Sequence, residues 1–345
     1  MTQRTPLAAF RRSILIATFA LSLFACSSGG DDSDNKFQFP ESGPLLLNFT
    51  SDYITGELRW MSAESASLAP EALSFGQDTK IAAYNGNVFI LERLPSSNLS
   101  CLIGRAGTIK QKSLEAGSMP YDLAVIGSKG YIALNEADYI QVFDVNTCNL
   151  GNKINLPIVN SNAATIKASG DTLLVVLQRL ENYVATEPGL LLRINASTET
   201  LIDTIQLNFY NPHASLLSKG KLFIASVDYF GASTGIEIVD LASGEIEILF
   251  DGGVSSMALD ESTQTLYASV YVGWGEVPVK PINLSDKSVG EALPGIIDAY
   301  NGLVFDKENK KLFIADVAGL KVYDTQTKAM ITVANDLPPY SLAIN

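Results

Sequence analysis

The sequence is poor in the residue types that build metal and redox centres. Its 345 residues include one histidine, His213, and three cysteines, Cys26, Cys101 and Cys148. A site with several histidine ligands is therefore excluded by count, and no pair of cysteines has the C-x-x-C spacing typical of zinc or redox motifs. We accordingly expect no metal and no cofactor.

Positive charge is also scarce. The chain has 24 Lys and Arg against 37 Asp and Glu, for a net charge of −13. Binding to nucleic acid requires stripes of Lys and Arg that contact phosphates, so we do not expect nucleic acid as a partner. Adhesion of the folded part to an anionic lipid face is disfavoured for the same reason.

No apolar run is long enough to span a bilayer, which takes about 20 residues. The longest is residues 13–25, SILIATFALSLFA, and Arg4, Arg11 and Arg12 precede it. A positive segment followed by a short apolar one is typical of a signal peptide, which we assign to residues 1–25.

Residues 23–26, LFAC, resemble a bacterial lipobox. The resemblance implies cleavage before Cys26 and acylation of this residue with palmitate-like chains, and several chains would anchor the protein stably. Ser27, where an aspartate would signal inner-membrane retention in enterobacteria, favours the outer membrane, on either its periplasmic or its cell-surface side. The alternative is an ordinary signal peptide with an incidental cysteine. Residues 26–42, rich in Ser, Gly and Asp, are expected to form an acidic flexible tether.

Amphipathic helical patterns are nearly absent, apart from a short stretch near residues 63–73. Alternating apolar strands instead recur along the chain, with four strands in each repeat. The aromatic or aliphatic residue that opens the second strand recurs every 42 to 49 residues. These residues are Leu46, Phe89, Tyr131, Leu174, Phe223, Tyr267 and Phe313. This period predicts an all-β, seven-bladed β-propeller of four-stranded antiparallel blades over residues 43–345.

The two ends of this domain complement each other. Residues 338–345, PPYSLAIN, read as a first strand, whereas residues 45–53, LLLNFTSDY, read as a second strand. We expect the C-terminal strand to join the N-terminal strands in one blade, which closes the ring and protects two sheet edges. A closed ring is expected to be monomeric.

Residues 130–157, GYIALNEADYIQVFDVNTCNLGNKINLP, resemble the YVTN-type propeller repeat, and residues 311–327 resemble it nearly as well. The resemblance implies the propeller architecture. That superfamily includes surface-layer proteins, binding proteins and lactonase-like enzymes, so it does not by itself assign a function.

Repeated acids mark the turns between third and fourth strands, at Asp144, Asp240 and Asp324. They could indicate calcium or catalysis, but an aspartate at this position also accepts hydrogen bonds from the backbone two residues on. Asn195 replaces it in one repeat and can do the same, which favours the turn interpretation.

Two groups of residues are candidates for ligand binding. The first lies where first strands begin, at the expected mouth of the channel: Tyr121, Asn162, His213, Ser255, Asn301 and Tyr340. The second consists of aromatics on three consecutive long loops: Tyr183, Tyr229, Phe230, Tyr271 and Trp274. Long loops on a rigid scaffold commonly carry binding residues. The alternatives are a polar ring that only orders water in the channel, and aromatics that only fasten the loops.

Cys101 and Cys148 lie in the outer halves of neighbouring repeats and are candidates for a disulfide between blades, provided their α-carbons lie within about 7 Å. We expect a non-catalytic envelope lipoprotein whose propeller face binds a partner protein or a small ligand. A lactonase-like hydrolase at the channel mouth, with His213, Arg179 and Glu136 as scattered candidates, is the alternative, and a purely structural spacer is a third possibility. No catalytic residue is assigned.

Overall fold

The computed structural model describes residues 36–39, 44–49, 55–62, 67–68, 73–76, 78–333 and 339–344. These residues form strands, turns and loops, with no helix among them. The described part therefore holds no helix of the length and hydropathy needed to cross a membrane. The predicted signal peptide, the lipidation site at Cys26 and most of the predicted tether lie outside the described residues.

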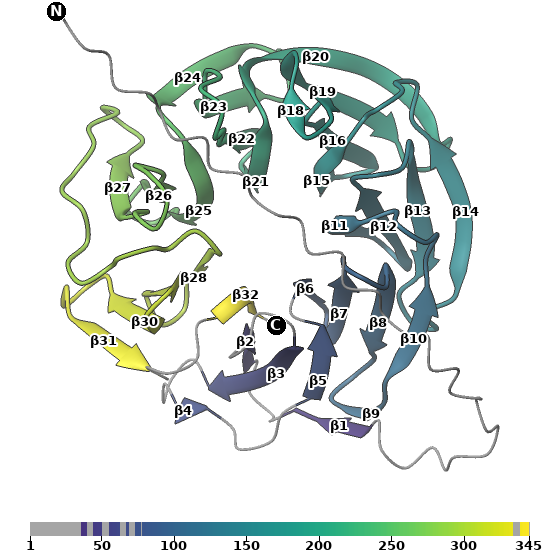
Figure 1. Cartoon of the computed structure of the whole chain (residues 1–345), viewed down its shortest axis with the longest axis horizontal. Helices are drawn as coiled ribbons and strands as arrows, with labels where there is room; N and C mark the ends of the chain where they lie inside the picture. Colours follow the sequence, from purple (N-terminus) through teal and green to yellow (C-terminus); the bar gives the residue numbers. More distant parts are fainter. Residues whose placement is uncertain are drawn as a thin grey trace, which may run out of the picture. The chain divides into compact units, whose positions relative to one another are not determined.

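Most of the sheets follow the repeats, and each runs from a first strand near the centre to a fourth strand at the outside (Figure 1). Five of the described sheets are four-stranded antiparallel meanders. In chain order they contain β6 (Thr79–Tyr84), β7 (Asn87–Glu92), β8 (Asn98–Leu102) and β10 (Lys110–Ser113); β11 (Pro120–Ile126), β12 (Lys129–Leu134), β13 (Tyr139–Asp144) and β14 (Leu150–Asn155); β15 (Ala163–Ser169), β16 (Thr172–Leu177), β19 (Pro188–Asn195) and β20 (Thr200–Tyr210); β21 (Pro212–Ser218), β22 (Lys221–Ser226), β23 (Gly235–Asp240) and β24 (Ile246–Asp251); β28 (Leu303–Asp306), β29 (Lys311–Asp316), β30 (Gly319–Asp324) and β31 (Met330–Val333).

A sixth sheet pairs the C-terminal strand with strands from the N-terminal part of the described residues. The C-terminal strand β32 (Pro339–Ile344) pairs antiparallel with β2 (Pro44–Phe49), with Leu342 opposite Leu47. The sheet continues through β3 (Thr55–Ser62), which pairs with both β4 (Ser67–Leu68) and β5 (Leu73–Gly76). The innermost strand thus comes from the C-terminus and the remaining strands come from the N-terminal part.

The sheet formed by β25 (Val254–Asp260), β26 (Thr265–Val270) and β27 (Val279–Asn283) has three strands, so the prediction of four strands in every repeat is wrong here. The described residues contain six sheets of four or five strands rather than seven. Pro281 explains the missing strand. The Pro281 carbonyl accepts a hydrogen bond from the Gly290 N–H at the outer edge of β27. Proline has no N–H that could donate a second hydrogen bond to a fourth strand there. The following chain continues irregularly, with single bonds from Leu293 to Val279 and from Ala299 to Val277.

The hydrophobic core lies between neighbouring sheets. The middle strands are covered on both faces, so β16 is buried at five consecutive positions, Leu173–Leu177. One cluster joins Tyr131 and Ile140 of one sheet to Ile166 and Leu192 of the next. Burial on both faces removes the strict alternation of apolar and polar residues that strands with one solvated face show.

The first strands contact one another in a circular order. β6 contacts β11, followed by β15, β21, β25, β28 and β32, and β32 in turn contacts β6. Figure 1 shows these strands around the central axis of residues 36–344. Their side chains therefore converge from distant parts of the sequence.

The repeated acids build turns, as the sequence indicates. The Asp144 carboxylate accepts hydrogen bonds from the backbone N–H groups of Asn146 and Thr147, at 3.1 and 2.8 Å. Asp240 and Asp324 do the same in their own turns, and the Asn195 side chain substitutes with its amide oxygen.

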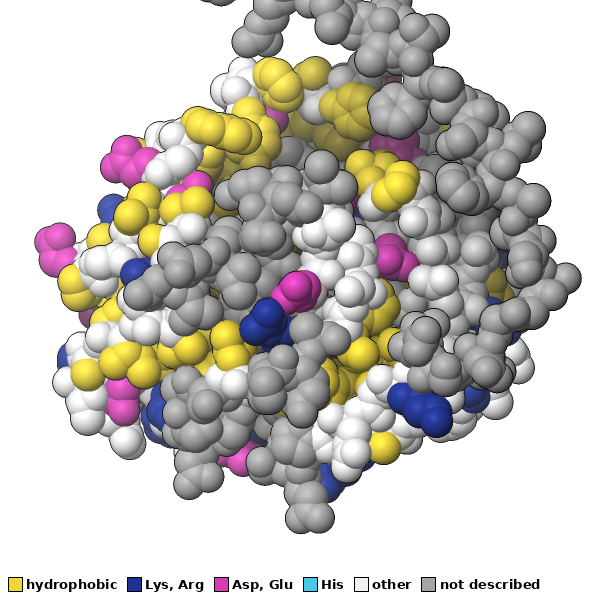
Figure 2. Space-filling view, turned by 60° about the horizontal axis from the view of Figure 1, so that its bottom comes forward, with side chains coloured by type: hydrophobic (Ala, Val, Ile, Leu, Met, Phe, Trp, Pro, Cys, Tyr) yellow, Lys and Arg dark blue, Asp and Glu magenta, His cyan; other side chains and the backbone are white. Residues whose placement is uncertain are grey.

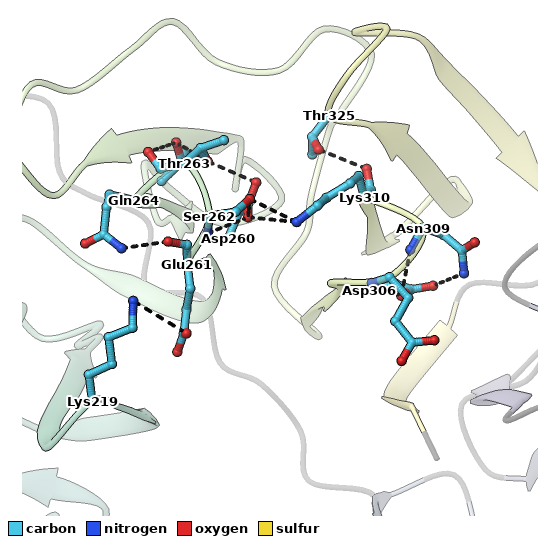
Figure 3. Close-up of polar contacts among 12 residues, drawn as sticks. Lys219, Asp260, Glu261, Ser262, Thr263, Gln264, Asp306, Asn309, Lys310 and Thr325 are labelled. Atoms are coloured by element: carbon cyan, nitrogen blue, oxygen red, sulfur yellow. Dashed lines mark hydrogen bonds and ion pairs between the residues drawn. The ribbon is translucent and has the colours of Figure 1, made fainter.

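The same device recurs between first and second strands, where the sequence analysis did not place it. Asp260 accepts from Ser262 and Asp306 accepts from Glu308 and Asn309 (Figure 3). The side chains of these aspartates accept hydrogen bonds from the backbone of their own turns and stabilise the turn geometry.

The folded part begins earlier than expected. Residues 36–39, assigned above to the tether, include β1 (Lys36–Gln38), which pairs with β9 (Ala106–Thr108). Phe37 and Phe39 are each 5% exposed and pack near Trp60, with Phe39 edge-on to the indole at 5.3 Å. Two phenylalanines supply the apolar area that a solvated tether lacks, which explains why this segment packs.

The predicted disulfide is confirmed. The Cα atoms of Cys101 and Cys148 lie 6.0 Å apart and their sulfur atoms are bonded. Cys101 is on β8 and Cys148 is in the turn between β13 and β14, so the bond joins two neighbouring sheets. A short hairpin, β17 (Leu180–Glu181) and β18 (Val184–Ala185), stands on the first of the long loops.

Candidate functional site

A bulge at the same place in five first strands shapes the candidate site. The ladder skips Tyr121 in β11, Ala164 in β15, His213 in β21, Ser255 in β25 and Tyr340 in β32. A bulge inserts one unpaired residue and turns its side chain away from the regular alternation. The bulged residues consequently line one end of the central channel.

A cavity of about 570 Å³ occupies this end, within the range of small-molecule sites. Of the channel-mouth candidates, Tyr121, His213, Ser255, Asn301 and Tyr340 contribute to its wall. The wall also contains charged residues that the sequence analysis missed. They are Asp78, Lys80, Arg93, Asp122 and Lys167.

Arg93 is held in place on one side of the cavity. It follows β7 directly, and its Nε donates to the Asp78 carboxylate at 2.6 Å, with a second contact from Nη2. Its guanidinium lies 4.9 Å from the ring centroid of Tyr121 and 5.9 Å from that of Tyr340. Burial alone would lower the pKa of Arg93, but Asp78 and the two tyrosines raise it, so the residue stays charged.

Two lysines also line the cavity. Lys167 of β15 donates to Asp122 of β11 at 2.5 Å, and the same carboxylate accepts from the backbone N–H of Ile166 at 3.1 Å. Lys80 of β6 has solvent access within the cavity but is surrounded by protein. Its pKa is lowered, first by removal from bulk water and further by Lys167 and Arg93, while Asp122 opposes the shift.

His213 lies among these groups and is neutral. Burial, and then the charges of Arg93 and Lys80, lower its pKa from 6.5 to about 4. Its ring lies 5.6 Å from that of Tyr300. The hydroxyl of Tyr300 is hydrogen-bonded to that of Tyr229, whose ring packs edge-on against Tyr271 at 5.3 Å.

This aromatic chain connects part of the loop group to the cavity. Tyr229 and Tyr271 come from two of the long loops, and Tyr300 lines the cavity wall. None of the five loop aromatics is itself part of that wall. Tyr183, Phe230 and Trp274 are 74%, 69% and 91% exposed, so solvent rather than a pocket covers them.

Asn162 does not take the position that the sequence analysis gave it. Its side chain is buried and bonds the carbonyl of Asn135 and the backbone N–H of Leu180, at 3.1 and 2.9 Å. The bulge in β15 lies two residues later, at Ala164. Asn301 does line the cavity, and its amide donates to the carbonyl of Pro339 at 3.2 Å.

The scattered hydrolase candidates do not converge. His213 lines the cavity, whereas Arg179 and Glu136 are absent from its described wall. Arg179 is ion-paired with Glu187 on its own loop. The described residues contain no group of three or more His, Cys, Asp or Glu side chains placed to hold a metal ion.

The missed charges left a sequence signal. Lys80, Asp122 and Lys167 interrupt first strands, in TKIAAY, PYDLAVI and AATIKAS, where buried strands are otherwise apolar. A charge on an innermost strand must reach the channel or an ion pair, since an unpaired buried charge is costly. Arg93 had no such signal, because it follows a second strand.

A second cleft lies at the other ends of β21, β25 and β28, lined by Leu217, Glu261, Phe305 and Lys310 among others. Several of its polar groups are engaged with one another (Figure 3). The Lys310 ammonium lies 2.9 Å from the Ser262 hydroxyl and 3.6 Å from Asp260, and Lys219 lies 3.7 Å from Glu261. Lys307 also lines this cleft, and its side chain has no hydrogen bond or ion pair among the described residues. The central cavity is the stronger candidate because the bulged residues of five first strands converge on it.

Solved structures with similar folds have different functions. Hydrazine synthase of Kuenenia stuttgartiensis is similar at 13% identity and a TM-score of 0.65, over 84% of this chain and 95% of that one. A putative 6-phosphogluconolactonase of Bacteroides fragilis matches at 11% identity and 0.65, over 92% and 100%. Apo AztD of Citrobacter koseri matches at 10% and 0.56, over 88% and 98%.

The sequence matches no protein-family model and no curated protein. At these identities the structural similarities establish a β-propeller fold and nothing finer.

Proposed function

We propose that this chain is a non-catalytic binding protein of the bacterial envelope, which takes a small polar ligand into the central cavity of its propeller. The observation that carries the proposal is the cavity itself, with five charged side chains and the bulged residues of first strands around it. Small-molecule sites are typically preformed hollows with a few convergent polar groups.

Binding is favoured over lactonase-like hydrolysis because both carboxylates of the cavity wall are already paired with cations. Asp78 is bonded to Arg93 and Asp122 to Lys167. A general base must be within hydrogen-bond reach of a substrate proton, whereas both of these carboxylates already accept hydrogen bonds from cationic side chains. His213 is neutral, but no carboxylate is bonded to it among the described contacts, so a Ser-His-Asp arrangement is not supported.

We extend the proposal to the number of blades and the closure of the ring. We infer that the three-stranded sheet counts as a seventh blade and that β32 closes the ring, which the circular contacts of the first strands support. A closed ring supports a monomer.

We also infer that Cys26 is lipidated and anchors the protein in the outer membrane, on its periplasmic or cell-surface side. In that case Cys26→Ser should move the protein from the membrane fraction to the soluble fraction, and membrane retention would contradict the lipobox interpretation.

The test is to purify the anchored protein from its native envelope and to identify bound small molecules by native mass spectrometry. We expect a ligand that is lost in Ser215→Trp, because an indole on β21 would fill the cavity. Ser285→Trp, on an exposed turn, is the matched control and should retain it. A ligand retained by both variants would contradict the site, and turnover of lactones that stops in Ser215→Trp would favour the hydrolase.

A further inference from the structure

We propose that the ligand of the central cavity is a small organic anion, bound through a carboxylate or phosphate group by Lys80, with Arg93 and Lys167 beside it. This inference rests on the proposed function, since it names the ligand class of the same site. The cavity wall contains more cations than carboxylates.

The described cavity wall contains three cations, Lys80, Arg93 and Lys167, and two carboxylates, Asp78 and Asp122. His213 adds no charge at neutral pH because its pKa is about 4. One positive charge is left over, in a chain whose net charge is −13. On the face in Figure 2, in contrast, Lys and Arg lie scattered among Asp, Glu and apolar side chains. The second cleft has the same balance, with Lys219, Lys307 and Lys310 against Asp260 and Glu261. The central cavity differs because its Lys80 lies close to two further cations, Arg93 and Lys167, within one hollow.

Lys80 carries this surplus. Arg93 has a direct carboxylate partner in Asp78 and Lys167 has one in Asp122, whereas no hydrogen bond or ion pair of the Lys80 side chain occurs among the described residues. Like charges nearby and removal from bulk water both disfavour its protonated form. A bound anion would relieve both effects, because an opposite charge stabilises the ammonium.

The Arg93 guanidinium is held in a fixed position from which it can contribute to anion binding. Asp78 occupies its Nε and Nη2 groups, and the rings of Tyr121 and Tyr340 fix its plane. The Nη1 group has no partner among the described contacts. A fixed guanidinium edge loses little entropy on binding an oxyanion. The tyrosines and His213 leave an aromatic and polar wall for the rest of the ligand.

His213 offers a direct assay, because it is the only histidine in the chain. Its Hε1 resonance can be followed by NMR at pH 7.5 while sodium phosphate or sodium formate is added. A sodium chloride titration matches the ionic strength, and glycerol serves as a neutral probe. We expect a saturable shift with phosphate, formate or both. The two arms separate a phosphate ligand from a carboxylate ligand.

Lys80→Met should weaken anion binding at least tenfold. Lys110→Met, an exposed lysine on the outermost strand of the same sheet, is the matched control and should bind as the wild type does. The ligand-free Lys80→Met protein should also show a higher His213 pKa, since Lys80 is one of the charges that lower it. This second readout verifies the position of Lys80 without any ligand.

The outcomes separate this inference from the proposed function. A saturable shift with glycerol but with neither anion would overturn the anion and retain the cavity as a binding site. Equal anion affinity in Lys80→Met and wild type would overturn the role of Lys80. If no probe gives a saturable shift up to about 100 mM, a hundredfold weaker than millimolar binding, the anion inference fails. The native ligand search still decides the proposed function.

Discussion

Breaking the disulfide between Cys101 and Cys148 is expected to lower the free energy of unfolding by up to about 4 kcal/mol. The two residues are 47 positions apart, and closing a loop of this length removes about 14 cal/mol/K from the entropy of the unfolded chain. The bond also joins two neighbouring sheets, so its loss acts at a boundary between repeats rather than within one.

The assay is equilibrium urea denaturation in a Cys26→Ser background, where these two are the remaining cysteines. Reduction of this protein removes the bond and keeps both sulfur atoms. The double variant Cys101→Ala/Cys148→Ala additionally removes the packing of two fully buried sulfurs. Reduction therefore measures the cross-link, and the further loss in the double variant measures packing.

Far-ultraviolet circular dichroism and the fluorescence of buried Trp60 should give coincident transitions, which would justify two-state treatment. A free energy of unfolding that changes by less than about 1 kcal/mol on reduction would refute the loop-entropy argument, since the estimate is several times larger.

Three other perturbations follow from the structure. Gly130→Ala should lower the free energy of unfolding by about 1–3 kcal/mol, because the new Cβ would lie 2.0 Å from the buried Phe143 ring. Gly151→Ala in the same sheet, where the new Cβ would lie 3.5 Å from its nearest neighbour, is the control and should be nearly neutral. Both are measured by urea denaturation, and equal losses of stability would exclude the clash. The pKa of His213 is lower in the folded protein, about 4 against 6.5, so as pH falls the unfolded chain takes up the proton first. The stabilisation is complete above pH 6.5 and is lost progressively down to pH 4, by up to about 3 kcal/mol. In His213→Asn this part of the pH dependence should vanish, and an unchanged curve would contradict the burial of a neutral imidazole. Deleting residues 339–345 removes β32 and exposes the edge of β2, so thermal unfolding should occur well below the wild-type temperature; an unchanged melting temperature would show that the pairing contributes little.

The repeats made much of the fold predictable. Period-two alternation at a nearly constant spacing predicts four-stranded antiparallel sheets, and five repeats form them. The sequence also predicts the pairing of the C-terminal strand with N-terminal strands, because residues 338–345 read as a first strand and residues 45–53 as a second strand. The turn acids were predictable because Asp144 and its equivalents act within three residues of themselves, with no need of tertiary context.

The exceptions depended on contacts that local patterns do not encode. The sheet at β25–β27 stops at three strands because one proline, Pro281, faces the edge where a fourth would pair. β1 forms because Phe37 and Phe39 find an apolar surface near Trp60, about 20 residues away in sequence. Asn162 was misplaced because the bulge of β15 lies two residues later.

The sequence by itself determined the sheet type, the repeat length and the turn chemistry, because each follows from neighbours along the chain. Only the tertiary structure decided the site. Lys80 lies on β6, Arg93 directly follows β7 and Lys167 lies on β15, so the three are up to 87 positions apart in the sequence. Their electrostatic coupling exists because the first strands meet around one axis. Asp78, Lys80 and Arg93 of one repeat carry the net positive charge, and the tertiary structure places the Asp122–Lys167 pair of two other repeats beside them.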